Sequence, residues 1–205
     1  MRILFQGDSI TDALRSREDD IYSGNGYPTL VAAELGFACP QEYEFFNRGI
    51  SGDRITDLIA RMKIDMINIK PDVMSILIGV NDVWHEVSRE NGVRTDLYES
   101  MYHLLIAELK TALPNLRIMI MEPFVLKGPA TEEAWDVFRA EVTAHAAAAK
   151  RVAEKNGLEF IPLQEKFDEA CKMAPVTYWL YDGVHPTSAG HELIAREWIK
   201  AFRSC

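Results

Sequence analysis

The chain has 205 residues, 48% of them hydrophobic, so it is long enough to bury the core of one domain and too apolar to be disordered. Its 22 basic and 31 acidic residues give a net charge of −9, which argues against binding to nucleic acid or to anionic membranes. No stretch approaches the ~18 apolar residues of a membrane-spanning helix, so no membrane partner is expected.

The N-terminal segment and the cysteines favour a reducing compartment. The apolar run at residues 3–5 is far too short for the core of a signal peptide. Cys39, Cys171 and Cys205 are odd in number, widely spaced and without a C-x-x-C pair. This pattern is typical of reduced thiols and offers no metal framework. We therefore expect a cytoplasmic protein without a metal site.

Short apolar runs alternate with helical patterns along the whole chain. The runs predict strands at residues 2–6, 43–47, 73–79, 116–121 and 158–161. Apolar spacing near the helical period predicts helices at residues 27–35, 54–69, 96–112, 131–156, 164–173 and 188–202. Asp53 and Thr131 are expected to cap the helices that begin beside them, and Gly36 to end the first. No repeat or linker divides the chain, so a single domain over residues 1–205 is expected.

This alternation predicts an α/β fold, a three-layer α/β/α sandwich around a five-stranded parallel sheet. Right-handed crossovers and five strands suit the flavodoxin-like strand order 2-1-3-4-5. The nearly continuous apolar run at residues 73–79 fits a central strand that is covered on both faces. Because parallel strands end on one edge of the sheet, polar segments after the first three strands are expected to converge there.

Ser9 follows the first predicted strand and is a candidate nucleophile. A serine hydroxyl is a weak nucleophile alone, so it needs a base, a group that orients the base, and donors for an oxyanion. Taken alone, Ser9 is more simply a helix cap, because Ser9-Ile10-Thr11-Asp12 also matches a capping box. Whether Ser9 is a nucleophile or only a helix cap depends on whether the rest of the chain supplies these partners.

Asp182 and His185 are the candidate partners of this serine. Histidine is the side chain whose pKa lies nearest neutrality, which suits a general base. An aspartate three residues earlier can hold the imidazole tautomer and balance the imidazolium formed on proton transfer. The glycine between them and Pro186 favour a turn that projects both side chains, although Asp-Gly alone is only a turn signal.

Donors for an oxyanion are expected from three places. The candidates are the backbone N–H groups of Ser9 and Gly52 and the side-chain amide of Asn81. Singly, Gly52 could be a turn glycine and Asn81 a helix cap. Their coincidence with Ser9, Asp182 and His185 at one sheet edge favours a catalytic site.

These segments resemble the four blocks of the SGNH (GDSL-type) hydrolases. The blocks are Gly7-Asp8-Ser9, Asn47-Arg48-Gly49-Ile50-Ser51-Gly52, Gly79-Val80-Asn81-Asp82 and Asp182-Gly183-Val184-His185-Pro186, and they occur in order. The resemblance implies a flavodoxin-like fold, a catalytic triad of Ser9, Asp182 and His185, an oxyanion hole from Ser9, Gly52 and Asn81, and no cofactor.

The first three blocks look closest to intracellular carbohydrate acetyl esterases such as acetyl-xylooligosaccharide esterase. That resemblance implies hydrolysis of short-chain acetyl esters on a carbohydrate such as acetylated xylooligosaccharides. Such enzymes are often oligomeric, so a homo-oligomer is expected.

Other residues near the four blocks carry weaker expectations. Asp8, Trp84, Trp179 and Tyr181 are candidate substrate-binding residues, although aromatic residues near a sheet edge more often pack in a core or an interface. His103, His145 and His191 fall in predicted helices and are expected to be structural or solvated. No His or Cys spacing supports a metal site.

Two other functions stay open at this point. One is a lysophospholipase or acyl-thioesterase with the same triad. The other is a flavodoxin-like phosphate-binding or signalling module that uses the loop after the first strand. The sequence also leaves open whether loops 10–26 and 122–131 cover the site.

Overall fold

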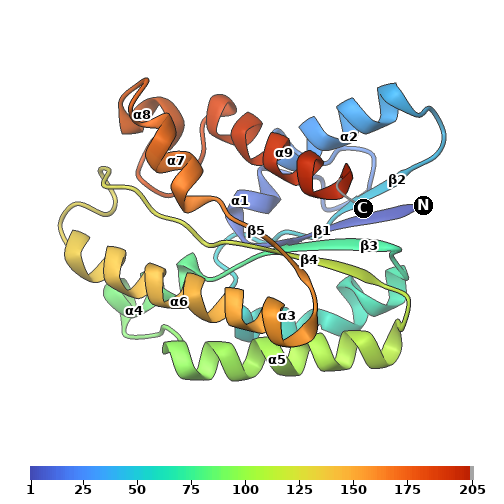
Figure 1. Cartoon of the computed structure of the whole chain (residues 1–205), viewed down its shortest axis with the longest axis horizontal. Coiled ribbons are helices and arrows are strands. Elements are labelled where there is room, and N and C mark those ends of the chain that lie inside the picture. The colour runs from blue at the N-terminus through green and yellow to red at the C-terminus, as the bar shows by residue number, and fades with distance from the viewer. Residues whose placement is uncertain (204–205) are drawn as a thin grey trace.

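The computed structural model describes residues 1–203 and contains a five-stranded parallel sheet between two layers of helices (Figure 1). The strands are β1 (Arg2–Gly7), β2 (Glu44–Asn47), β3 (Val73–Leu77), β4 (Arg117–Met121) and β5 (Glu159–Ile161). Their order is β2-β1-β3-β4-β5, and every neighbouring pair is parallel. The predicted fold class and strand order are confirmed.

The helices divide between the two faces of the sheet (Figure 1). One layer contains α2 (Tyr27–Ala38), α7 (Gln164–Ala170), α8 (Val176–Trp179) and α9 (Ser188–Arg203). The other contains α3 (Ile55–Asp65), the 3-10 turn η1 (Ile67–Ile69), α4 (Val80–Arg89), α5 (Thr95–Ala112) and α6 (Trp135–Asn156). A single turn, α1 (Ser9–Asp12), follows β1 directly.

Each face of the sheet has its own core because side chains alternate along a strand. Phe5 of β1 packs on the α2–α9 side, with its ring centroid 5.8 Å from Tyr27 and 5.4 Å from Trp198. Its neighbour Leu4 points to the α3–α5 side, where Tyr102 is also fully buried. Burial on both faces explains why the central strands read as continuous apolar runs.

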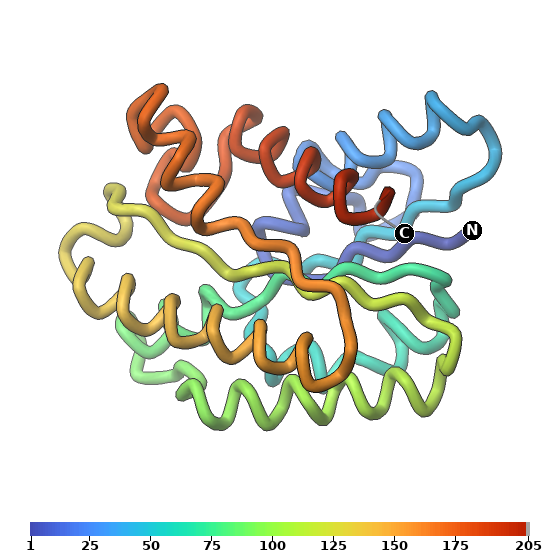
Figure 2. Tube along the Cα trace, in the orientation of Figure 1, coloured from blue at the N-terminus to red at the C-terminus, as the bar shows by residue number. Residues whose placement is uncertain are grey.

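The loops that leave the strands gather at one end of the molecule, opposite the N-terminus (Figure 2). Loop 8–26, the segment 48–54 and α4 leave the carboxyl ends of β1, β2 and β3. Because β1 lies between β2 and β3, the residues after β1 are flanked by the other two segments. This is the edge at which α/β folds place their ligands.

Two predicted helix caps are wrong. Asp53 does not cap α3, because its carboxylate lies 2.7 Å from Nε of Arg61, and the N–H of Ile55 donates to the Asp82 carboxylate instead. Thr131 lies before α6, in a loop where its hydroxyl donates to the Leu126 carbonyl at 2.7 Å. The Asp82 carboxylate of α4, 27 residues from Ile55, takes the place expected of Asp53, whereas the bond of Thr131 lies within its own loop.

Several helical segments also differ from the sequence-based expectation, among them α3, which ends at Asp65, and α6, which begins at Trp135. Helix α2 runs through Gly36 to Ala38. The segment after β3, for which no helix was predicted, forms α4. The aromatic segment after residue 175 contains the short helix α8. These differences change where side chains point but leave the layer architecture intact.

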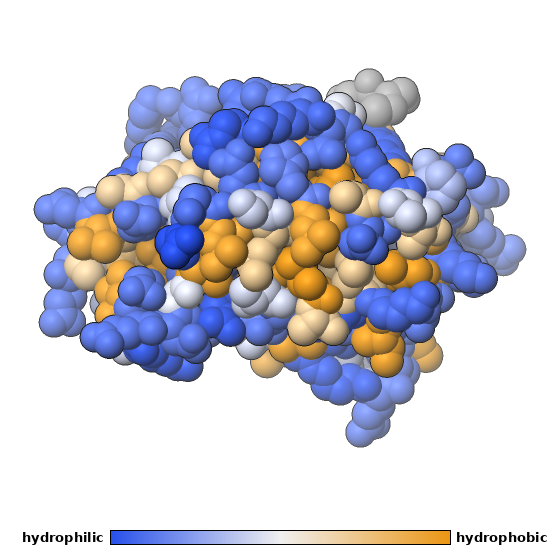
Figure 3. Space-filling view, turned by 90° about the horizontal axis from the view of Figure 1, so that it is seen from below, coloured by the Kyte–Doolittle hydropathy of each residue, from blue (hydrophilic) through white to orange (hydrophobic). Residues whose placement is uncertain are grey.

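The layer of α3, α5 and α6 carries apolar residues on its outer surface. Figure 3 looks onto this layer and shows apolar residues gathered in a band across it. The exposed large apolar side chains of these helices are Ile64, Leu97, Leu104 and Val137. Surfaces of this kind are common at protein–protein interfaces. The expected homo-oligomer stays a prediction.

The remaining sequence-level expectations concern cysteines and membranes. Cys39 and Cys171 are free thiols, and Cys205 lies outside the described residues. Within residues 1–203, no helix is both long and apolar enough to span a membrane.

Candidate active site

Ser9 is the first residue of α1, at the carboxyl end of β1. Asp8 is the N-cap of this turn, and its Oδ1 accepts a hydrogen bond from the N–H of Ile10 at 3.0 Å. The alternative reading of Ser9 as the helix cap is therefore wrong, because Asp8 holds that position. The Ser9 hydroxyl takes no part in capping and faces the histidine instead, with Oγ 3.0 Å from Nε2 of His185.

Asp8 lies behind this serine and away from the solvent. It is 1% exposed, and its Oδ2 has no hydrogen-bond partner among the described residues. Burial raises the pKa of this carboxyl to about 7. Asp8 is not among the residues that line the cavity at Ser9, and its expected role in substrate binding stays a prediction.

Asp182 and His185 belong to a tight turn that their own hydrogen bonds stabilise. Oδ1 of Asp182 accepts from the N–H groups of Val184 and His185, at 2.9 and 2.8 Å. Oδ2 lies 2.6 Å from Nδ1 of His185. A carboxylate accepts, so Nδ1–H donates and Nε2 is left as the acceptor that faces the Ser9 hydroxyl.

The same contacts shift the pKa values of both residues. The hydrogen bond to Asp182 raises the pKa of His185 above its ordinary 6.5, although burial opposes this. Burial alone would raise the pKa of Asp182, but hydrogen bonds from the side chain and backbone of His185 lower it overall. The imidazolium form of His185 is therefore stabilised next to the serine.

Loop 122–131 supports this turn from behind. The N–H of Leu126 donates to the Gly183 carbonyl, and that of Ala130 to the Asp182 carbonyl, both at 2.9 Å. A Cβ added at Gly128 would lie 2.5 Å from the Gly183 nitrogen, so the close approach requires glycine. No residue of this loop lines the cavity at Ser9, whereas Ala13, Leu14 and Asn25 of loop 10–26 do.

Gly52 and Asn81 come from the segments that flank Ser9. Gly52 has a φ of +88°, which favours glycine, and a Cβ added there would meet nothing within 4 Å. Asn81 lies in the first turn of α4 and is not its cap, because Gly79 occupies that position. Its Nδ2 donates to the Asp53 carbonyl at 3.1 Å, which leaves the second N–H of the amide for another acceptor.

Hydrogen bonds tie the three segments together. Ser51 donates from its backbone N–H and its hydroxyl to Oδ2 of Asp12, at 3.0 and 2.8 Å. Asp82 of α4 accepts from the N–H of Ile55, and burial raises the pKa of this carboxyl to about 8. Among residues 1–203, neither the N–H of Ser9 nor that of Gly52 has a partner. Fixed N–H groups without partners are what an oxyanion requires.

A cavity of about 490 Å³ opens over the serine. It is lined by Ser9, Ala13, Leu14, Asn25, Ser51, Tyr181, His185, Pro186, Ser188 and His191. None of these is a lysine, arginine, aspartate or glutamate. Asn25, Ser188 and His191 were not predicted to lie here. The available signals were that Asn25 belongs to the Gly-rich segment 23–26 and that Ser188 and His191 follow His185 closely in the sequence.

The three expected aromatic residues occupy different places. Tyr181 lines the cavity, is 55% exposed, and stacks on His185 with ring centroids 5.6 Å apart. The ring of Trp84 lies 5.7 Å from His185 but packs on Phe138 and does not line the cavity.

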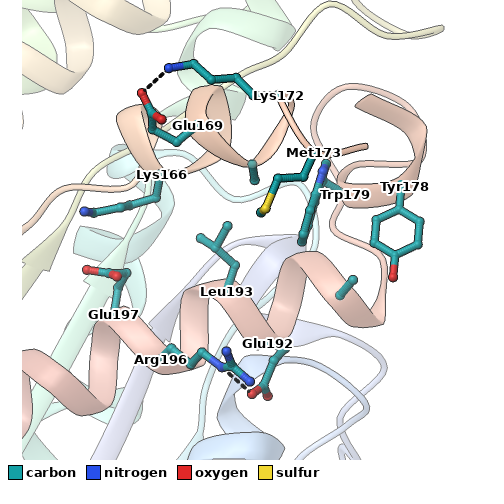
Figure 4. Close-up of a pocket in the computed structure, with 12 residues that line it drawn as sticks. Lys166, Glu169, Lys172, Met173, Tyr178, Trp179, Glu192, Leu193, Arg196 and Glu197 are labelled. Carbon is teal, nitrogen blue, oxygen red and sulfur yellow. Dashed lines mark hydrogen bonds and ion pairs between the residues drawn. The ribbon is translucent and has the colours of Figure 1, made fainter. Parts of the chain in front are cut away.

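Trp179 lines a separate groove of about 600 Å³ between α7, α8 and α9 (Figure 4). There it lies with Met173, Leu193 and Tyr178, away from the lining of the Ser9 cavity. Ion pairs between Lys172 and Glu169 and between Arg196 and Glu192 border this groove. Of the three aromatic candidates, only Tyr181 lines the cavity at Ser9.

A metal is not indicated by the arrangement of side chains. Within the part of the chain that the structure describes, no group of three or more His, Cys, Asp or Glu residues could hold a metal ion.

Comparisons with known proteins match this chain over nearly its whole length. The family model described as GDSL-like Lipase/Acylhydrolase matches residues 5–193. An acetylxylan esterase of Geobacillus stearothermophilus is 35% identical over 208 residues, covering 97% of this chain and 92% of the relative.

Solved structures of similar proteins cover nearly the whole chain as well. A protein of Parabacteroides merdae described as a GDSL-like lipase superposes with a TM-score of 0.93 and 38% identity, covering 98% of this chain and 94% of the other. The Geobacillus acetylxylan esterase superposes with a TM-score of 0.88 and 33% identity, with the same coverage. Two further structures of that esterase are of catalytic mutants, in which a serine or an aspartate is replaced by alanine.

Proposed function

This chain belongs to the GDSL-like lipase/acylhydrolase family and is a carboxylic ester hydrolase, and on that premise we propose that it is a serine esterase that removes acetyl groups from a carbohydrate. The observation that carries the proposal is the continuous path of contacts from Ser9 through His185 to Asp182, at 3.0 and 2.6 Å. The catalytic mutants of the Geobacillus esterase, at one serine and one aspartate, support the same pair of residue types.

The first half of the reaction acylates the serine. Oγ of Ser9 attacks the ester carbonyl carbon while Nε2 of His185 takes its proton. The oxyanion that forms accepts hydrogen bonds from the N–H groups of Ser9 and Gly52 and from the Asn81 amide. Asp182 keeps Nδ1 of His185 protonated and stabilises the imidazolium. His185 then protonates the leaving alcohol oxygen, and the acetyl group stays on Ser9.

The second half releases acetate. His185, neutral again, removes a proton from a water molecule that attacks the acetyl carbonyl. The same donors hold the second oxyanion. Collapse of this intermediate breaks the bond to Oγ, which takes the proton back from His185. No cofactor takes part in these steps.

The uncharged lining of the cavity supports a neutral substrate. Lysophospholipids and acyl thioesters of coenzyme A carry phosphate groups, which proteins usually bind with arginine, lysine or a helix N-terminus. The lining of the Ser9 cavity contains no lysine or arginine. This disfavours both the lysophospholipase alternative and a phosphate-binding module. The name of the acetylxylan esterase relative supports a carbohydrate acetate instead.

The substrate class is tested by acetate release from acetylated xylooligosaccharides, together with a series of p-nitrophenyl esters of increasing chain length. We expect acetate release, and a kcat/KM that falls by at least ~10-fold from the acetate to the octanoate ester, because Asn25, Ser51, Ser188 and His191 place polar groups in the cavity that a long acyl chain would contact. An octanoate ester hydrolysed as well as the acetate, with no acetate released from the sugar, would reject carbohydrate deacetylation while leaving the esterase assignment intact.

Replacing Asn81 by alanine is expected to lower kcat for p-nitrophenyl acetate by about 10²- to 10³-fold, because one oxyanion donor is lost. The exposed Asn68 in η1 offers a matched control, and Asn68→Ala should retain wild-type kcat. Thermal unfolding should be followed in parallel, since the Asn81 amide also bonds the Asp53 carbonyl. A folded Asn81→Ala variant with full kcat would remove Asn81 from the oxyanion hole.

A further inference from the structure

His191, expected from the sequence to be structural or solvated, is held in one tautomer at the edge of the Ser9 cavity. It lies in the first turns of α9, and its Nδ1 accepts a hydrogen bond from the N–H of Tyr27 at 3.2 Å. A nitrogen that accepts from a backbone N–H carries no proton, so the proton of the neutral ring is on Nε2. Burial, with a smaller contribution from His185, lowers the pKa of His191 to about 4. The ring is therefore neutral near pH 7.

The N–H of Nε2 is the part of this ring left without a protein partner. A Cβ added at Gly26 would lie 2.9 Å from Cε1 and 3.2 Å from Nδ1, so this side of the ring is packed against the chain. Nε2 has no hydrogen-bond partner among the described residues, and it is not fully enclosed by other atoms. It is therefore open to the cavity that His191 shares with Ser9 and His185.

The groups around His191 determine what this donor could bind. Asn25, Ser51 and Ser188 add neutral amide and hydroxyl groups to the cavity wall. An acetyl group has one hydrogen-bond acceptor of its own, the carbonyl oxygen, which the oxyanion donors take. The N–H of His191 is therefore available to the alcohol portion of the ester. A neutral wall of donors and acceptors matches an uncharged polyhydroxyl compound.

We propose that Nε2–H of His191 is a fixed donor that binds an oxygen of the substrate's alcohol portion, within a subsite that Asn25 and Ser188 complete for an uncharged sugar. This inference rests on the proposed function, since it assigns the part of the cavity that the leaving alcohol occupies. It makes His191 a specificity-determining residue: it contacts the sugar and takes no part in proton transfer.

Two substitutions separate the donor from the structural contact. In His191→Asn, Oδ1 can still accept from the Tyr27 N–H, but no N–H reaches the position of Nε2. In His191→Gln, the longer side chain can place an N–H there. His103→Asn, on the opposite helical layer, is the matched control. The readout is the ratio of kcat/KM for acetylated xylooligosaccharides to kcat/KM for p-nitrophenyl acetate, whose alcohol portion is not a polyol.

We expect His191→Asn to lower this ratio about tenfold, mainly through a higher KM for the sugar ester, and His191→Gln to recover part of the loss. His103→Asn should keep the wild-type ratio. An unchanged ratio in His191→Asn, or an equal loss on both substrates, would overturn the proposal. A wild-type protein that hydrolyses neither substrate would instead contradict the proposed function, and the inference with it.

The unaltered protein provides a second test that does not depend on a variant folding. The ¹⁵N resonance of His191 Nε2 should shift on addition of deacetylated xylotriose, and the bound sugar should leave the proton on Nε2. A resonance that does not move at xylotriose concentrations that inhibit the esterase would contradict contact between His191 and the sugar.

Discussion

Replacing Ser9 by alanine is expected to lower kcat/KM for p-nitrophenyl acetate by on the order of 10⁴- to 10⁶-fold, because the covalent intermediate can no longer form. The substitution removes one oxygen from a half-buried side chain whose only described hydrogen bond is to His185. The thermal unfolding midpoint should therefore change little. Initial rates and unfolding curves for the purified variant provide the measurement.

Ser88→Ala is the matched control for this experiment. Ser88 is an exposed residue of α4 whose hydroxyl donates to the Trp84 carbonyl, outside the cavity at Ser9. It should keep the wild-type rate. A folded Ser9→Ala protein with more than a few per cent of wild-type activity would show that another group attacks the ester.

Replacing Asp182 by asparagine is expected to lower kcat/KM by on the order of 10⁴-fold. An amide at this position can donate to Nδ1 of His185, which favours the tautomer with its proton on Nε2, so the nitrogen facing Ser9 can no longer accept a proton. Backbone N–H groups of Val184 and His185 can still donate to the amide oxygen, so the turn should persist. The exposed Asp136 at the start of α6 gives the control, Asp136→Asn.

The pH dependence checks the same pair of residues. His185 acts as a base only when neutral, so wild-type kcat/KM should fall as the pH drops through the pKa of His185. The Asp182 hydrogen bond places that pKa above the ordinary 6.5. Asp182→Asn removes this effect, and the acidic limb of its residual activity should move to lower pH. If the acidic limb of Asp182→Asn stays at the wild-type pH, Asp182 does not act on the catalytic base.

The architecture could be predicted from the sequence because each strand carries an unambiguous signal. The run at residues 73–79 is apolar on both faces, as a central parallel strand must be, and the helices between strands follow a regular period. Parallel topology then requires Ser9, Gly52 and Asn81 to leave the same edge of the sheet. The residues nominated for the site follow from this reasoning and from the four family blocks.

Contacts between distant segments account for much of what the sequence did not predict. The buried Asp82 carboxylate accepts from the N–H of Ile55, at the start of α3, in place of the expected Asp53. The cap of α1 is a local exception, because Asp8 accepts from the N–H of Ile10, only two residues away, where the capping-box pattern pointed to Ser9. Trp179 lies in a neighbouring groove because α8 turns it toward α7 and α9. No local sequence pattern indicates the role of His191, because its tautomer depends on a hydrogen bond from the N–H of Tyr27, 164 residues away.

Covalent labelling of the nucleophile tests the central claim most directly. The protein is treated with a fluorophosphonate, which reacts with activated serines, and the modified peptide is identified by mass spectrometry. The proposed mechanism predicts one adduct, on Ser9, whose stoichiometry follows the loss of p-nitrophenyl acetate hydrolysis. Complete inactivation with the adduct on another residue, or full labelling of Ser9 with activity retained, would contradict it.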